Sequence, residues 1–248
     1  MALLAFEGVA KSYPRSGVVF EPFDLEIDEG DFVGAWGERR SGKSTLLRLA
    51  AGIEAPDGGR IRFGGRDLAG MSESERSILR RTEIGIAATS TDTASLLADR
   101  SSTVVEQVAL PLIFQGASHN TASKLAHHFL RMVGVGDCIS TAPWELRAGE
   151  ITRVALARAL VREPRLLLVD EPAITHSPEE RDAIRELLHD LSRRLQLAML
   201  VASEEITMMA GAPRILSVGD GKVISNEQPG TVIEFPGSRL AGGEASER

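Results

Sequence analysis

The stretch "GERRSGKST", Gly37 to Thr45, decides how the rest of the chain is interpreted. It has the spacing G-x-x-x-x-G-K-[ST], in which the backbone N–H groups of a glycine-rich loop surround phosphate groups. The context fits, because "DFVGAW" before it is typical of a strand and "STLLRLAAG" after it is typical of a helix start. The stretch therefore predicts a loop that holds the phosphates of a nucleotide at the positive end of a helix.

Two side chains of this loop carry the expected chemistry. Lys43 is placed to reach the β and γ phosphates of ATP, and the Ser44 hydroxyl is placed to bind Mg²⁺. The predicted nucleotide-binding residues of the loop are Gly37, Glu38, Arg39, Arg40, Ser41, Gly42, Lys43, Ser44 and Thr45.

A second part of the site is predicted in "RLLLVDEP", Arg165 to Pro172. A run of leucine and valine suits a strand that is covered on both faces, and ligands bind at the carboxyl ends of such strands. Asp170 is expected to hold the Mg²⁺ shell. Glu171 is expected to act as the general base on an attacking water, a role that contributes roughly 10² to 10⁴ in rate. Together with the phosphate loop, these acids predict a P-loop NTPase.

The pattern of apolar residues predicts an α/β fold with a mainly parallel core sheet and an N-terminal antiparallel β layer. Short apolar runs alternate with segments of helical spacing, which is typical of βαβ units. The runs are "FVGAW", "IGIAA", "LLLVD", "LAMLVA" and "RILSV". Residues 2 to 9, 18 to 27 and 59 to 63 are predicted to be antiparallel strands joined by turns.

Helical patterns predominate between about residues 90 and 148, which predicts an inserted helical subdomain. We expect one ATP-binding domain over residues 1–235. The small, polar residues 236–248 are expected to form a flexible tail.

Composition excludes several other classes of protein. The net charge of −7 argues against nucleic acid as a partner, because duplex binding needs a basic face. No run approaches the roughly 18 apolar residues that a membrane helix needs, and the N-terminus does not have the pattern of a signal peptide. The single cysteine, Cys138, excludes an internal disulfide. These features predict a cytoplasmic location.

Over nearly its whole length the chain resembles the ATP-binding subunits of ABC transporters. The stretch "RAGEITRVALARALVREPRLLLVDEP" is similar to the signature motif of that family, its helix and the strand that follows. Tyr13 in "KSYP" matches the aromatic residue that stacks on adenine. More narrowly, "TVVEQVALPLIF", "LRMVGVGD" and "PWEL" resemble the lipoprotein-releasing, macrolide-exporter and cell-division type.

The resemblance also shows where this sequence departs from the family. The LSGGQ-type signature, which contacts the nucleotide held by the opposite subunit, is "LRAGE" here, so that its contacting residues become Arg147, Ala148, Gly149 and Glu150. An arginine in place of serine keeps the attraction to phosphate but changes the geometry, and the methyl group of alanine limits close backbone approach.

Other family positions are substituted as well. Thr89 replaces the glutamine that links the nucleotide to the permease, and Ser203 replaces the histidine of the last motif. Ser177 replaces an aspartate and, in "SPEE", also forms the capping box of a helix. Arg40 stands where the family usually has glycine; it either adds positive charge toward phosphate or points into solvent.

The resemblance implies an ATP-binding subunit, peripheral on the inner face of the cell membrane, that couples dimer closure to an integral-membrane permease. Its second ATPase subunit is the same chain or an intact relative. Ground-state binding groups for Mg-ATP are present, whereas several transition-state groups are missing, so we expect weak or partner-dependent hydrolysis. The alternative is a nucleotide-dependent regulatory module that does not itself drive transport. Trp144 and Glu145 fall where the family meets the coupling helices of its permease.

Overall fold

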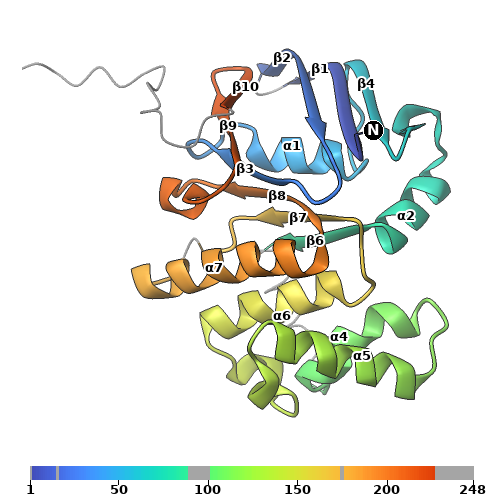
Figure 1. Cartoon of the computed structure of the whole chain (residues 1–248). Coiled ribbons are helices and arrows are strands. Elements are labelled where there is room, and N and C mark those ends of the chain that lie inside the picture. Colours follow the sequence, from blue (N-terminus) through green and yellow to red (C-terminus); the bar gives the residue numbers. More distant parts are fainter. Residues whose placement is uncertain (1, 15–16, 89–100, 174–175, 227–248) are drawn as a thin grey trace, which may run out of the picture.

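An antiparallel sheet of four strands forms one layer of the protein, at the top of Figure 1. The computed structural model describes residues 2–14, 17–88, 101–173 and 176–226. The strand order is β2-β1-β4-β5 and all neighbours are antiparallel. The strands are β1 (Leu4–Tyr13), β2 (Gly17–Ile27), β4 (Gly58–Phe63) and β5 (Arg66–Asp67). The expected N-terminal antiparallel layer is therefore present.

A second sheet of six strands has the order β10-β9-β3-β8-β7-β6. Its strands are β3 (Phe32–Trp36), β6 (Ile84–Ala88), β7 (Leu166–Asp170), β8 (Ala198–Ser203), β9 (Arg214–Gly219) and β10 (Lys222–Asn226). Five of these strands run parallel, as expected, whereas β10 pairs antiparallel with β9 at the edge. The bounds of β3, β6 and β7 coincide with the predicted apolar runs. β10 was not predicted, because its residues are half-exposed or exposed and form no apolar run.

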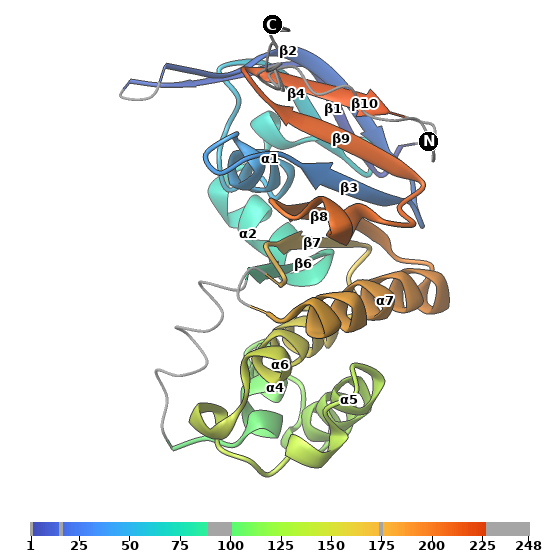
Figure 2. The ribbon, with the colours of Figure 1, turned by 90° about the vertical axis from the view of Figure 1, so that its left-hand side faces the viewer.

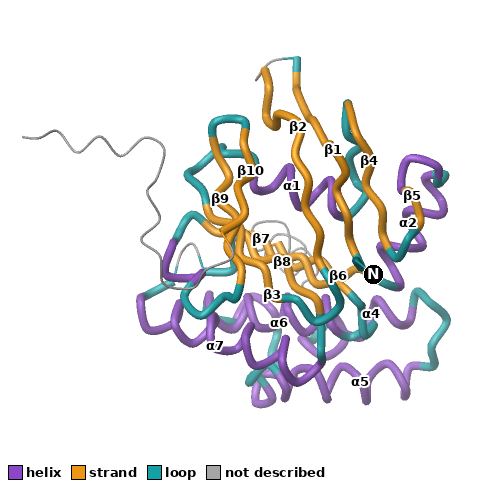
Figure 3. The backbone as a smooth tube through the Cα atoms, turned by 45° about the horizontal axis from the view of Figure 1, so that its top comes forward, coloured by secondary structure: helices purple, strands orange, loops and turns teal. Residues whose placement is uncertain are grey.

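Helices fill the space between the sheets and cover the other face of the second sheet (Figures 1 and 3). They are α1 (Lys43–Ala50), α2 (Glu73–Thr82), α4 (Val104–Ile113), α5 (His119–Met132), α6 (Ala148–Leu160) and α7 (Pro178–Leu195). Short 3-10 turns are η1 (Leu68–Gly70), η2 (Gly136–Cys138), η3 (Pro143–Glu145) and η4 (Ile206–Met209). None of the described helices has the length and apolar character needed to span a membrane.

The alternation of side chains along the central strands separates two hydrophobic cores. Successive residues of a strand point to opposite faces of the sheet. In β7, Leu166 and Leu168 pack in the core that holds α1 and the antiparallel sheet, whereas Leu167 and Val169 pack in the core that holds α4, α5, α6 and α7. Helix α1 and helix α6 therefore lie on opposite faces of the six-stranded sheet, as Figure 2 also shows.

Helical elements follow one another from residue 101 to 148, within the range expected for a helical subdomain. Helices α4 and α5 pack on each other and on α6. The part of that range at residues 89–100 lies outside the described residues, as does the expected tail at 236–248. The division of the chain into these units stays a prediction.

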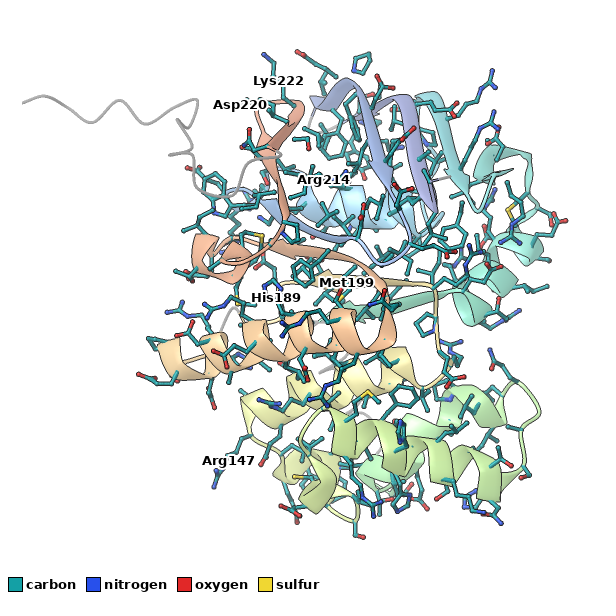
Figure 4. The ribbon with its side chains drawn as sticks, in the orientation of Figure 1. Arg147, His189, Met199, Arg214, Asp220 and Lys222 are labelled. Atoms are coloured by element: carbon teal, nitrogen blue, oxygen red, sulfur yellow. The ribbon has the colours of Figure 1, made fainter. Side chains whose placement is uncertain are left out.

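A serine hydroxyl caps the start of α2, α5 and α7, whereas α6 has no side-chain cap. Ser177 accepts a hydrogen bond from the Glu180 N–H at 3.3 Å, and its own N–H donates to the Glu180 carboxylate, so the predicted capping box of α7 is confirmed. At α6 the N-cap is Arg147, whose N–H donates to Glu150 Oε2 at 2.7 Å but whose side chain has no acceptor. Figure 4 shows the Arg147 side chain pointing away from the body of the protein.

Arg147 allows a test of this capping argument. We expect Arg147→Ser to have a free energy of unfolding about 1 kcal/mol higher than Arg147→Ala, because serine supplies the missing acceptor for an N–H of the first turn. Urea unfolding followed by circular dichroism measures the difference. The alanine variant is the matched control, since it removes the same guanidinium without adding a cap. Equal stabilities would contradict the argument.

Candidate functional site

The register of three parallel strands gathers the predicted site residues at one edge of the sheet. Trp36, which precedes the phosphate loop, pairs with Ser203 at the end of β8. Asp170 at the end of β7 pairs with Ala202 of β8. The phosphate loop, the two acids and Ser203 therefore lie at the carboxyl ends of neighbouring strands, where sheets of this kind bind ligands.

Two glycines of the phosphate loop have no room for a side chain. A Cβ on Gly37 would lie 2.1 Å from the carbonyl oxygen of Val218, and a Cβ on Gly42 would lie 2.9 Å from the ring of Phe20. Gly42 also has a φ of 109°, which side chains rarely adopt. Arg40 has a φ of 65°, in the left-handed region that favours glycine, and its side chain is exposed. This conformation gives a physical reason for the glycine that the family usually has there.

The ammonium of Lys43 is buried in the centre of the loop. Its Nζ donates to the carbonyl oxygens of Gly37 at 2.7 Å and Glu38 at 2.9 Å. The same Nζ lies 3.4 Å from Glu171 Oε1, and only 5% of the Lys43 side chain is exposed. The lysine thus connects the first residues of the loop to the acid at the end of β7.

The site also holds buried polar atoms that the protein leaves without a hydrogen-bond partner. Among the described residues these include Ser41 Oγ and Asp170 Oδ1. Burial raises the pKa of Asp170, against a hydrogen bond from Ser44 and the positive charges of Lys43 and Arg48. An unsatisfied hydroxyl and an unsatisfied carboxylate oxygen beside a loop of N–H groups fit a phosphate and a hard cation that accepts oxygen ligands.

Glu171 is held in place by the main chain around it. Its backbone is in the left-handed region with a φ of 49°, a conformation that costs about 1–2 kcal/mol and is typical of functional sites. Its N–H donates to the Ala202 carbonyl at 2.9 Å, and its Oε2 accepts from the Glu204 N–H at 3.1 Å. Burial raises the pKa of Glu171, against the Glu204 N–H and the charge of Lys43.

Glu204 is a site residue that the sequence did not predict. Its carbonyl accepts a hydrogen bond from Trp36 Nε1 at 3.0 Å, so its peptide groups connect β3 to the Glu171 carboxylate. Backbone groups carry this role, and no residue type at this position would have indicated it. Ser203, next to it, is buried, and its hydroxyl accepts from the Glu205 N–H at 3.1 Å.

Tyr13 lies at the end of β1 beside the first turn of α1. Its hydroxyl is 3.4 Å from Thr45 Oγ1 and donates to Glu54. The structure therefore places the aromatic residue predicted to stack on adenine next to the last residue of the phosphate loop.

The signature residues do not join the phosphate loop of their own chain. Arg147, Ala148, Gly149 and Glu150 lie at the start of α6, on the other face of the six-stranded sheet from α1 (Figures 1 and 2). Gly149 approaches Glu180 and His176, a buried histidine that the sequence did not single out. His176 Nε2 lies 3.2 Å from Thr152 Oγ1 of α6, and burial lowers the pKa of this imidazole. Thr89 lies outside the described residues.

Comparison with known proteins supports the resemblance. A sequence model of the family described as "ABC transporter" matches residues 20–174. The chain is 34% identical to the lipoprotein-releasing system ATP-binding protein LolD of Cereibacter sphaeroides, over 90% of this chain and 99% of that protein. It is 36% identical to the methionine import ATP-binding protein MetN of Rhizobium johnstonii, over 88% of this chain. The match spans only 59% of the length of that MetN protein.

Solved structures lead to the same assignment. The fold matches a dimeric structure of the ATP-binding cassette MJ0796 in a post-hydrolysis state, bound to ADP and Pi, with a TM-score of 0.80. That match has 27% identity and covers 92% of this chain and 100% of the other. With its phosphate loop, its two acids and these similarities, the chain belongs to the ABC transporter family of ATP-binding proteins.

Proposed function

We propose that this protein binds Mg-ATP at the Gly37–Thr45 loop and couples dimer closure to a membrane permease, with weak or partner-dependent hydrolysis. The observation that carries the proposal is the buried ammonium of Lys43, held between two loop carbonyls and the Glu171 carboxylate. The loop N–H groups and Lys43 would bind the phosphates, and Tyr13 would stack on the adenine.

Mg²⁺ would be held by the Ser44 hydroxyl and the Asp170 carboxylate. The unsatisfied Asp170 Oδ1 supports this assignment, and a protein site with so few ligands suits a cation that keeps several waters and binds phosphate oxygens. When bound, the ion supplies Lewis-acid polarisation of the phosphates. Glu171 would orient a water and accept its proton, because its carboxylate is fixed by the Glu204 N–H and lies next to Lys43.

Weak hydrolysis follows from groups that are absent. Ser203 stands where the family has histidine, and its hydroxyl accepts a main-chain hydrogen bond instead. Arg147 stands where the signature has serine. Loss of one preorganised donor typically costs roughly 10² to 10³ in rate, about 2.7–4 kcal/mol. Such losses leave ground-state binding nearly unchanged, because the loop, Lys43 and Asp170 are retained.

A second cassette is needed to complete the site. The signature residues are separated from their own phosphate loop by the six-stranded sheet, so they can reach a nucleotide only on another subunit. In a homodimer both composite sites would contain Arg147. In a heterodimer with an intact relative, the phosphate loop of this chain would face a serine-containing signature, and that site would turn over. The dimeric form of the MJ0796 cassette supports the pairing of two cassettes.

The partner on the membrane side is proposed to be a permease, by similarity to proteins named for lipoprotein release and methionine import. Trp144, 47% exposed in η3, is proposed to contact it. The alternative is a nucleotide-dependent regulatory module of a membrane complex. The exposed Arg147 and the main-chain role of Ser203 favour that alternative, since both remove groups needed for turnover but not for binding.

Glu171→Gln separates the two functions. We expect this variant to bind ATP like the wild type but to lower the turnover of the reconstituted complex by roughly 10²- to 10⁴-fold, because the amide cannot accept the proton of water. Phosphate release measures turnover. Glu163→Gln is the matched control, because Glu163 is exposed, has a similar φ of 50° and lies before β7 rather than after it. Unchanged turnover and transport in Glu171→Gln would favour the regulatory module.

Asp170→Asn tests the predicted Mg²⁺ ligand through stability. Because burial raises the pKa of Asp170 in the folded protein, the folded state binds this proton more tightly than the unfolded state. Stability therefore falls as pH rises through the window between the ordinary and the raised pKa. Asparagine does not titrate, so without nucleotide and Mg²⁺ we expect Asp170→Asn to be more stable than the wild type at pH 7. Below the window we expect no such gain.

Urea unfolding at several pH values measures this difference. The same variant is expected to lose most of the additional stabilisation that Mg²⁺ gives in the presence of ATP, because a ligand stabilises only the state that binds it. Asp28→Asn, at an exposed aspartate, is the control and should change neither quantity. A gain that persists at low pH, or an unchanged response to Mg²⁺, would refute the assignment of Asp170.

A further inference from the structure

A closed ring of hydrogen bonds connects Tyr13 to the phosphate loop. The Tyr13 hydroxyl donates to Glu54 Oε2, and Glu54 Oε1 accepts from Arg48 Nε at 2.6 Å. Arg48 Nη2 donates to Thr45 Oγ1 at 3.2 Å, and Thr45 Oγ1 lies 3.4 Å from the Tyr13 hydroxyl. The four side chains come from β1, α1 and the segment after α1, so the ring fixes these elements relative to one another.

The side chains of this hydrogen-bonded ring differ in exposure. Of its two charged members, Glu54 is less exposed than Arg48. Thr45 is buried, Glu54 is 24% exposed and Arg48 is 43% exposed. Glu54 accepts hydrogen bonds through both of its oxygens, one from a phenol and one from a guanidinium. Hydrogen bonds to a charged acceptor are about twice as strong as neutral ones, so Glu54 is the residue that holds the ring together.

The residues before Tyr13 are tied to the same segment. The Lys11 ammonium lies 5.3 Å from the centroid of the Tyr13 ring and donates to the Ala55 carbonyl at 2.9 Å. The Ser12 N–H donates to the Asp57 carboxylate at 2.7 Å. The Tyr13 ring is therefore held at its hydroxyl by Glu54 and approached by a cation, rather than left free to rotate.

We infer that Glu54, with Arg48, is a positioning residue that fixes the Tyr13 ring for stacking on the adenine of a bound nucleotide. This inference rests on the proposed function. Because the Tyr13 side chain is already ordered before ATP binds, binding does not have to restrict its rotation. Less side-chain entropy is therefore lost on binding. The phosphates are bound by other groups, the loop N–H groups and Lys43. Glu54 therefore controls the contribution of the base to affinity and leaves the contribution of the phosphates unchanged.

Comparison of ATP with inorganic tripolyphosphate separates these two contributions, because tripolyphosphate has no base. For the full chain in the presence of Mg²⁺, we expect Glu54→Ala and Tyr13→Phe each to weaken ATP binding by roughly 2- to 12-fold, the fold-change expected for ordering one side chain on binding. Binding of tripolyphosphate should change by less than about two-fold. Calorimetric titration measures both dissociation constants.

The double variant Tyr13→Phe/Glu54→Ala shows whether the two residues act through the same hydrogen bond. If they do, the loss of ATP affinity in the double variant should equal that of either single variant rather than their product. Glu83→Ala is the matched control, because Glu83 has the same 24% exposure and also pairs with arginines, Arg66 and Arg165. It should leave ATP affinity unchanged. Thermal unfolding confirms that each variant is folded at the temperature of the titration.

The outcomes distinguish this inference from the function on which it rests. If the wild type binds neither ATP nor tripolyphosphate, the proposed function fails, and the inference fails with it. If the wild type binds ATP but the variants weaken both ligands equally, or weaken neither, the proposed function stands and the positioning role of Glu54 is overturned. Multiplicative losses in the double variant would also overturn it.

Discussion

The buried ammonium of Lys43 is the interaction on which the site depends. A desolvated cation needs acceptors on several sides, and here two loop carbonyls and the Glu171 carboxylate provide them. These acceptors belong to segments more than 120 residues apart in the sequence, the phosphate loop and the end of β7. The same contacts that satisfy the lysine therefore hold the phosphate loop against the acid. Binding geometry and folding are coupled at this point.

Parallel strand pairing makes that coupling possible. Strands β3, β7 and β8 end at the same edge of the sheet, and their alternating side chains leave α1 on one face and α6 on the other. The residues predicted to bind the nucleotide are thus assembled on the α1 side, while the predicted signature residues lie at the start of α6 on the other face. Within its own chain, the exposed Arg147 leaves the start of α6 without a side-chain cap. Its effect on a nucleotide would, under the proposed function, require a second subunit.

Much of this architecture could be predicted from sequence, for identifiable reasons. The strands β3, β6 and β7 are short apolar runs bounded by turns, and their bounds coincide with the predicted ones. Ser177 was predicted to cap α7, because a capping box is a local pattern. β10 was not predicted, because an exposed edge strand needs no apolar run. The role of Glu204 could not be predicted either, since it is exerted by peptide groups, and the Tyr13–Glu54 contact joins residues that only the fold brings together.

This chain departs from the family pattern at Arg147, Ser177 and Ser203, and its fold does not require the family's residues at these positions. Lys43 is buried in an ion pair with Glu171, and Gly37 and Gly42 have no space for a Cβ, so substitutions there would cost stability as well as binding. Ser203 and Ser177, by contrast, satisfy main-chain N–H groups locally, and Arg147 is exposed. The residues found at these positions are therefore compatible with the fold of this chain. This division is consistent with the proposed function, in which nucleotide binding persists and hydrolysis is weak.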